Sequence, residues 1–174
     1  TGGLGDGSFN DQAQQGVQQA QSELGIEYNE AQPDEVSEFG TLQQQFAGST
    51  DPVYDLICCI GFLQQSALQE NAPEFPDRNF MAVDTVPMQD TDGDGEPDSQ
   101  IDNVASYVFT EQEGSYLVGQ LAGLLTTRSF SAGAGSTAAD STSVGFVGGV
   151  ESPLIRRFEA GYTAGVRAAN ENVE

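Results

Sequence analysis

The chain of 174 residues contains no histidine, no lysine and no tryptophan, and it has only two cysteines. Without histidine, neither a Ser-His-Asp nor a Cys-His catalytic arrangement can form, so we predict a protein that is not an enzyme. Cys58 and Cys59 are neighbours in an apolar run, where successive side chains of a strand point to opposite faces. We therefore expect two buried thiols and no disulfide between them.

Positive charge is also scarce, because 27 acidic residues stand against 5 basic ones and the formal net charge is −22. This balance excludes nucleic acid as a partner, since phosphates repel such a surface. At ordinary ionic strength the like charges repel one another, whereas molar salt shortens the Debye length to about 3 Å. We expect a folded protein suited to high salt rather than a disordered acidic tail, because the acids are spread along segments with clear apolar periodicity.

Apolar residues recur with the periods of helices and strands in alternation. The run at 54–60 lies between Asp51-Pro52 and Gly61, which is typical of a strand buried on both faces of a parallel sheet. The alternation predicts a doubly wound α/β fold with a parallel sheet and flanking helices. The expected strands are 26–28, 54–60, 79–83, 104–109 and 144–147, and the expected helices are 9–24, 36–46, 62–72, 111–127 and 153–169.

Glycines and small residues suggest how the chain is divided. In the helix expected at 111–127, Gly114, Gly119 and Gly123 each cost roughly 1 kcal/mol relative to alanine, so we expect close packing against a neighbour. We predict a first lobe at 1–127, a flexible linker at 128–143, and the opening strand and helix of a second lobe at 144–174. Too few residues precede the first glycine-rich turn to form a strand, so we expect a fold truncated at both ends.

The turn at 5–11, Gly-Asp-Gly-Ser-Phe-Asn-Asp, joins a glycine-rich turn to a helix start. Ser8 and Asp11 match a capping box, which places Phe9 and Asn10 in the first helical turn, where backbone N–H groups can meet a ligand or water. The alternative is a well-capped helix start in which Phe9 belongs to the core. Gly25 is expected to end this helix.

A second acidic segment resembles part of a calcium-binding loop. Asp90, Asp92, Asp94 and Asp98 occupy relative positions 1, 3, 5 and 9, and glycine stands at position 6, as in the first part of an EF-hand loop. Position 12, which needs a bidentate acid, is Ile101 instead. The segment is therefore either a weak calcium site or a solvated acidic loop.

In its motifs the chain resembles the basic membrane protein, or purine nucleoside receptor-like, family of ABC-transporter substrate-binding lipoproteins, in a version suited to halophilic archaea. The resemblance implies the two-lobed type I periplasmic-binding-protein fold, with a ligand between the lobes. The stretches that carry it are 5–11, 55–57 with 61–62, 103–106 through 109 to 111–115, and 144–149 with 155–162.

The family implies an importer component at the cell surface, which captures a nucleoside or similar small polar solute and delivers it to ABC permease subunits. Contact with the membrane would be made only through a lipid anchor outside this chain. A ligand-sensing module and a calcium-dependent nucleoside hydrolase are the alternatives. The resemblance, together with the rule that ligands bind beyond the carboxyl ends of parallel strands, marks as ligand-binding Asp6, Phe9, Asn10, Gly61, Phe62 and Asp84.

In this picture the carboxylates of Asp6 and Asp84 accept hydrogen bonds from a ribose diol or a purine nitrogen, and Asn10 both donates and accepts. Phe9 or Phe62 stacks on a base. The plainer interpretations are that Asp84 caps a strand end and that Phe62 is a core residue of its helix.

Overall fold

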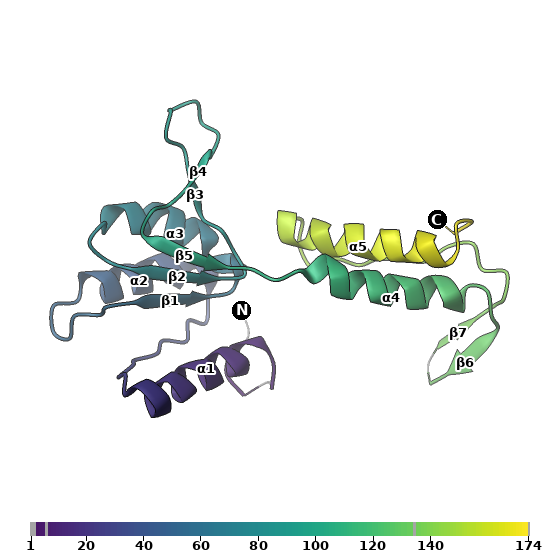
Figure 1. Ribbon diagram of the computed structural model, residues 1–174, viewed down its shortest axis with the longest axis horizontal. Coiled ribbons are helices and arrows are strands. Elements are labelled where there is room, and N and C mark those ends of the chain that lie inside the picture. The colour runs from purple at the N-terminus through teal and green to yellow at the C-terminus, as the bar shows by residue number, and fades with distance from the viewer. Residues whose placement is uncertain (1–2, 6, 134, 174) are drawn as a thin grey trace. The chain divides into compact units, whose positions relative to one another are not determined.

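The computed structural model describes residues 3–5, 7–133 and 135–173, and the chain forms two compact units, 1–108 and 109–174. The first unit is built on a parallel sheet with the strand order β1-β2-β5 (Figure 1). These strands are β1 (Ile57–Ile60), β2 (Phe80–Val83) and β5 (Val104–Tyr107). The helices of this unit are α1 (Phe9–Leu24), α2 (Phe39–Gly48) and α3 (Gln65–Asn71), with 3-10 turns η1 (Val36–Glu38), η2 (Phe62–Gln64) and η3 (Ala72–Glu74).

The core of the first unit lies on one face of this sheet. Alternate strand residues point into it, where they meet apolar side chains of α2 and α3. The opposite face is incompletely covered, because Cys58, Ala105 and Tyr107, which lie on it, are exposed. The buried cluster consists of Ala47, Ile57, Cys59, Leu68, Ala72, Phe80, Ala82, Ile101 and Val104.

This one-sided packing corrects two predictions. The strand at 54–60 is shorter than expected and is not buried on both faces, and Cys58 is exposed while Cys59 is buried. The burial of Cys59 raises the pKa of its thiol to about 12. The strand expected at 26–28 is absent from the described residues, where no strand pairs with that segment and β1 forms the edge of the sheet. The glycine stop is confirmed, since Gly25 has φ 70° and its N–H donates to Gln21 O at 3.0 Å.

The second unit is a helix pair with a small hairpin. Helices α4 (Glu111–Leu125) and α5 (Pro153–Ala169) lie side by side, and β6 (Phe130–Ala132) pairs antiparallel with β7 (Gly135–Thr137) (Figure 1). Glycines let the two helices approach at backbone distance: a Cβ on Gly119 would overlap the carbonyl of Tyr162, and one on Gly123 would lie 2.7 Å from Val166 O. The prediction of close packing is confirmed at these two glycines and wrong for Gly114, which faces open space.

The segment between these helices differs from the predicted linker and strand. Strands β6 and β7 form the hairpin, which is tied to α4 because the Thr137 hydroxyl donates to Leu125 O at 3.2 Å. No strand forms at 144–147 among the described residues, since no described strand lies beside it to share hydrogen bonds. The boundary between the compact units falls at 108/109, whereas we placed the lobe boundary after 127; the two-lobed division itself stays a prediction.

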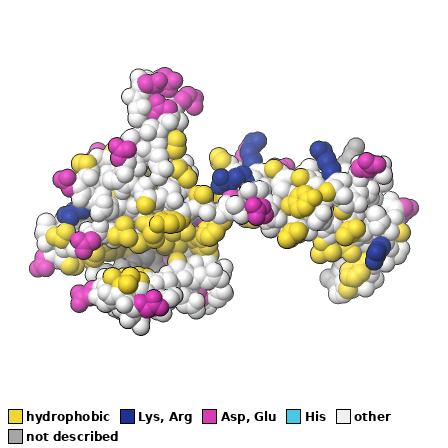
Figure 2. Space-filling view, viewed as in Figure 1, with side chains coloured by type: hydrophobic (Ala, Val, Ile, Leu, Met, Phe, Trp, Pro, Cys, Tyr) yellow, Lys and Arg dark blue, Asp and Glu magenta, His cyan; other side chains and the backbone are white. Residues whose placement is uncertain are grey.

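Charge is distributed unequally between the two units. Residues 1–108 contain 20 of the 27 acidic residues and one arginine, whereas residues 109–174 contain 7 acids and four arginines. In Figure 2 dark blue arginine side chains are seen on the second unit, and magenta acidic side chains gather at the tip of the ribbon formed by β3 (Met88–Gln89) and β4 (Ser99–Gln100). No helix in the described part of the chain is both long and apolar enough to cross a bilayer.

Candidate functional site

The carboxyl ends of β1 and β2 bring two of the predicted residues to one edge of the sheet. Gly61 follows β1, and its N–H donates to Val83 O at 3.0 Å; Asp84 follows β2, and its N–H donates to Tyr107 O at 2.7 Å. Both residues have positive φ, 99° and 69°. The chain therefore leaves the sheet sharply at each strand end, where open α/β sheets hold their ligands.

An aromatic side chain from the start of α1 reaches this edge. A Cβ built on Gly61 would lie 3.9 Å from Phe9 Cε1, so the Phe9 ring is close to the end of β1. Phe9 is 37% exposed and is not a core residue, and Phe62 and Asn10 are half-buried. The structure thus brings Phe9 to Gly61, as the sequence predicted. Whether these residues contact a ligand stays a prediction.

The glycine-rich turn before α1 is organised by Asp11, and the predicted capping box is wrong. Ser8 is the N-cap residue, but its side chain makes no capping hydrogen bond. Instead the Asp11 carboxylate accepts the N–H groups of Gly5 at 2.7 Å and of Gly7 at 2.6 Å. A carboxylate at that position can bond backward into the turn because the glycines there adopt positive φ. Asp6, a predicted ligand residue, lies outside the described residues.

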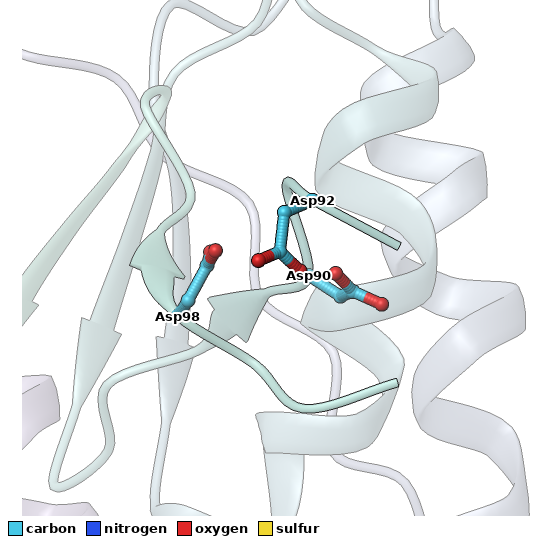
Figure 3. Close-up of side chains that lie close together, drawn as sticks. All are labelled: Asp90, Asp92 and Asp98. Atoms are coloured by element: carbon cyan, nitrogen blue, oxygen red, sulfur yellow. The ribbon is translucent and has the colours of Figure 1, made fainter. Parts of the chain in front are cut away.

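The acidic loop projects from the antiparallel ribbon of β3 (Met88–Gln89) and β4 (Ser99–Gln100). Oxygen atoms of Asp90, Asp92 and Asp98 lie within 4.8 Å of one another, and all three side chains are exposed (Figure 3). Asp94 is outside this group, and its carboxylate accepts Glu96 N–H at 2.8 Å.

Hydrogen bonds inside the loop hold this arrangement. The Asp90 carboxylate accepts Gly93 N–H at 2.6 Å and Gly95 N–H at 2.8 Å, and these two bonds lower the pKa of Asp90. Ile101, which stands where a calcium loop has its last acid, is 2% exposed and belongs to the core. Three carboxylates are therefore grouped as a hard cation requires, but the twelfth position cannot contribute. Calcium binding stays a prediction.

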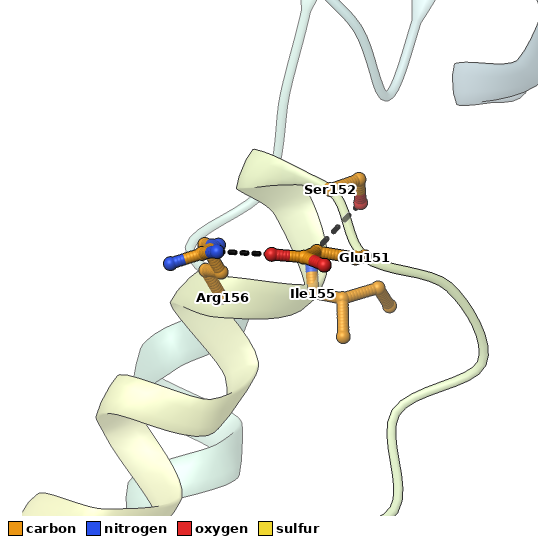
Figure 4. Close-up of polar contacts among 4 residues, drawn as sticks. All are labelled: Glu151, Ser152, Ile155 and Arg156. Carbon is orange, nitrogen blue, oxygen red and sulfur yellow. Dashed lines mark hydrogen bonds and ion pairs between the residues drawn. The ribbon is translucent and has the colours of Figure 1, made fainter.

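Among the described residues of the second unit, two ion pairs differ in their exposure to solvent. The side chain of Glu111, the first residue of α4, is 4% exposed; its Oε1 accepts Arg157 Nε at 2.7 Å, and its Oε2 is buried without a hydrogen-bond partner. The second pair, Arg156 with Glu151, is exposed and flanks the start of α5, where Ser152 Oγ accepts Ile155 N–H at 3.3 Å (Figure 4). Ser152 therefore caps the start of α5.

Two shallow hollows on the second unit include none of the predicted ligand residues. One lies between α4 and α5, and the other on α5 is bordered by Arg156 and Arg167. The first is lined by Gln112, Glu113, Tyr116, Leu117, Ala160, Gly161 and Ala164. Its mainly apolar lining offers few groups that could orient a polar solute.

Comparison with known proteins covers the whole chain. The model of the family described as "ABC transporter substrate-binding protein PnrA-like" matches residues 1–174. The CD4+ T-cell-stimulating antigen of Listeria monocytogenes is 37% identical over 100% of this chain and 43% of that protein. The ABC transporter nucleoside-binding protein BmpA of Lactococcus lactis is 30% identical over 99% of this chain and 42% of that protein.

The crystal structure of an ABC transporter solute-binding protein from Aeropyrum pernix matches with a TM-score of 0.71 and 32% identity, over 98% of this chain and 42% of that one. The likeness confirms the predicted α/β fold with a parallel sheet and flanking helices. The chain spans less than half the length of these relatives. No comparison tests the halophilic origin, which stays a prediction. With its full length matched, the chain belongs to the PnrA-like family of ABC transporter substrate-binding proteins.

Proposed function

We propose that the protein to which this chain belongs is the substrate-binding component of an ABC importer, which captures a small polar solute outside the cell. The observation that carries this proposal is the family match over residues 1–174. The edge where β1 and β2 end supports it, because Gly61 and Asp84 leave the sheet there side by side and Phe9 lies against Gly61. Delivery would be to the permease subunits of the importer, with a lipid anchor outside this chain holding the protein at the cell surface.

A nucleoside is the ligand that the predicted residues suit best. The carboxylate of Asp84 can accept hydrogen bonds from a ribose diol, and the Asn10 amide can both donate and accept. The partly exposed rings of Phe9 and Phe62 offer flat apolar surfaces on which a base can stack. The Lactococcus relative is named as nucleoside-binding, which agrees with this chemistry. Asp6 is proposed for the same role as Asp84 from the resemblance alone.

The proposed role is binding without catalysis. The sequence contains no histidine to serve as a general base, and partial burial of the Cys58 thiol raises its pKa, which disfavours the nucleophilic thiolate. A solute receptor needs only preorganised polar and aromatic contacts, and the strand-end edge provides positions for both.

Calorimetric titration of the full-length protein in molar sodium chloride, with purine and pyrimidine nucleosides, sugars and amino acids, tests this function. We expect at least one nucleoside to bind. Phe9→Ala should then weaken its affinity by about 1 to 3 kcal/mol, the size of one base–aromatic stack. The matched control is Phe130→Ala, because Phe130 is also an exposed phenylalanine but lies in β6. Tight binding of a sugar or an amino acid, with no response to nucleosides, would overturn the ligand assignment.

A further inference from the structure

The turn that follows β2 has an unusual backbone and is held firmly. Asp84 is the non-glycine residue with positive φ among those the structure describes, at 69°. Residues other than glycine rarely adopt this left-handed region, and aspartate does so more often than most because its short side chain can bond locally. The next residues anchor the turn inside the protein, because Thr85 is 5% exposed and Pro87 is fully buried. A conformation of this kind persists only where the surroundings enforce it.

Two glutamines of α3 bond to the residues that follow Asp84. Gln65 Oε1 accepts the Thr85 hydroxyl at 2.9 Å, and Gln69 Nε2 donates to Met88 O at 2.8 Å. Residues four apart lie on the same face of a helix, so one side of α3 bonds to both ends of the turn at 85–88. The two bonds have opposite direction, because Gln65 is the acceptor in the first and Gln69 is the donor in the second.

The helix that holds this turn is itself fixed at the end of β1. The chain passes from Gly61 through η2 directly into α3, and Gln64 N–H donates to Gly61 O at 3.1 Å. The continuous segment of η2 and α3 thus starts directly after Gly61, and its side chains bond to the turn after Asp84. The two strand ends that form the predicted ligand edge are mechanically joined through α3.

We propose that Gln65 and Gln69 are positioning residues of the ligand site, which hold Asp84 in the left-handed conformation required for binding. This inference rests on the proposed function, in which Asp84 contacts the solute. The glutamines bond to the turn and act on the ligand only through Asp84. Holding a binding group in place before the ligand arrives lowers the entropic cost of association.

Because the two hydrogen bonds run in opposite directions, replacing glutamine by glutamate should preserve the bond at position 65 and break the bond at position 69. Gln65→Glu keeps an acceptor for the Thr85 hydroxyl, whereas Gln69→Glu removes the donor to Met88 O. In the full-length protein in molar salt, with adenosine and uridine as probes, we expect Gln65→Glu to bind like the unchanged protein. Gln65→Leu and Gln69→Glu should each weaken binding about two- to tenfold, the range expected for one lost hydrogen bond. Gln45→Leu, at an exposed glutamine of α2, is the control.

Amide hydrogen exchange provides a readout independent of the ligand. The Asp84 amide should exchange faster in Gln65→Leu and Gln69→Glu, while amides of β2 keep their protection. Unchanged exchange at 84–88 would overturn the positioning role. The role would also be overturned if Asp84→Asn weakened binding but Gln65→Leu and Gln69→Glu exchanged faster at Asp84 without any loss of affinity.

Two further outcomes separate this inference from the proposed function. If adenosine or uridine binds and Asp84→Asn has no effect, Asp84 is not a ligand residue and the positioning role fails with it. If both Asp84→Asn and Gln65→Leu weaken binding, the double variant decides. A positioning residue adds nothing once the Asp84 carboxylate is gone, whereas an independent structural effect would remain and would refute the proposal.

Discussion

Replacing Gly165 by alanine tests how α4 and α5 are held together. Gly165 lies in α5, and a Cβ there would overlap the carbonyl oxygen of Tyr116 and come within 2.8 Å of Gln120 N and 2.9 Å of Tyr116 C. All three neighbours are backbone atoms of α4, which cannot rotate aside as a flexible side chain does. The added methyl group therefore forces the two helices apart and disturbs the close contacts at Gly119, Gly123 and Gly161.

Two opposing effects set the size of the change. Alanine is favoured over glycine in an open helix position by about 1 kcal/mol. Overpacking a closely packed interface costs about 1 to 3 kcal/mol, and occasionally more where several contacts are lost together. Because the clash at Gly165 is entirely with backbone, we expect overpacking to dominate and the free energy of unfolding of the second unit to fall by about 2 kcal/mol. For a unit of this size, that loss lowers the Tm by about 10 °C.

Thermal unfolding in molar sodium chloride, followed by circular dichroism, measures this change, and amide exchange in α4 and α5 locates it. Gly114→Ala is the matched control in α4, because a Cβ there meets nothing within 4 Å. We expect that variant to gain up to about 1 kcal/mol. If Gly165→Ala unfolded at the same temperature as Gly114→Ala, the backbone-to-backbone packing described here would be refuted.

Four further predictions concern charge and the thiols. Arg157→Ala leaves the buried Glu111 carboxylate without its partner, so in a urea titration it should destabilise the second unit by about 1 to 3 kcal/mol. The control Arg156→Ala breaks an exposed pair and should change the stability by less than about 1 kcal/mol. Ellman's reagent should label Cys58 in the folded chain and reach Cys59 only on unfolding, and equal labelling rates would contradict the burial of Cys59. The pKa of the Cys59 thiol rises from 9.0 to about 12 on folding. The stability contributed by the buried neutral thiol should therefore be lost as the pH rises from 9 towards 12. Calcium in excess sodium should raise the Tm. Asp92→Asn should abolish that rise, whereas the control Asp94→Asn should leave most of it, because Asp94 lies outside the carboxylate group. A rise that is lost with Asp94 and kept without Asp92 would contradict a site formed by Asp90, Asp92 and Asp98. Amide exchange at increasing sodium chloride should show residues 1–108, with 20 acids and one arginine, gaining more protection than residues 109–174, and equal gains would argue against charge repulsion as the cause.

Elements whose signals are local were predictable from the sequence. Strands β1, β2 and β5 are short apolar runs, and the start of α5 has a serine cap followed by proline. These strands and this helix start can therefore be located without knowledge of what packs against them. The expected strands at 26–28 and 144–147 did not form, since a strand depends on a partner and apolar pattern alone does not supply one. Likewise Gly114 and Gly119 are indistinguishable in sequence, and only the position of α5 separates them.

The strand-end positions of Gly61 and Asp84 followed from topology, because parallel strands end at a common edge. The approach of Phe9 to Gly61 was anticipated by placing both at that edge. The roles of Asp11 and Gln65 were not predicted. The sequence predicts a capping box for Asp11, and Gln65 is one of many glutamines in helices of this chain, so neither residue signals its role before the turn it bonds to is known.

The ribbon of β3 and β4 has both its ends secured by core residues, Pro87 before it and Ile101 after it, with Ile101 N–H donating to Pro87 O at 3.4 Å. The nine residues between the two strands make their hydrogen bonds almost entirely with one another, so their sequence can be exchanged without disturbing the sheet. The tip is thus a natural insertion point for a fluorescent reporter.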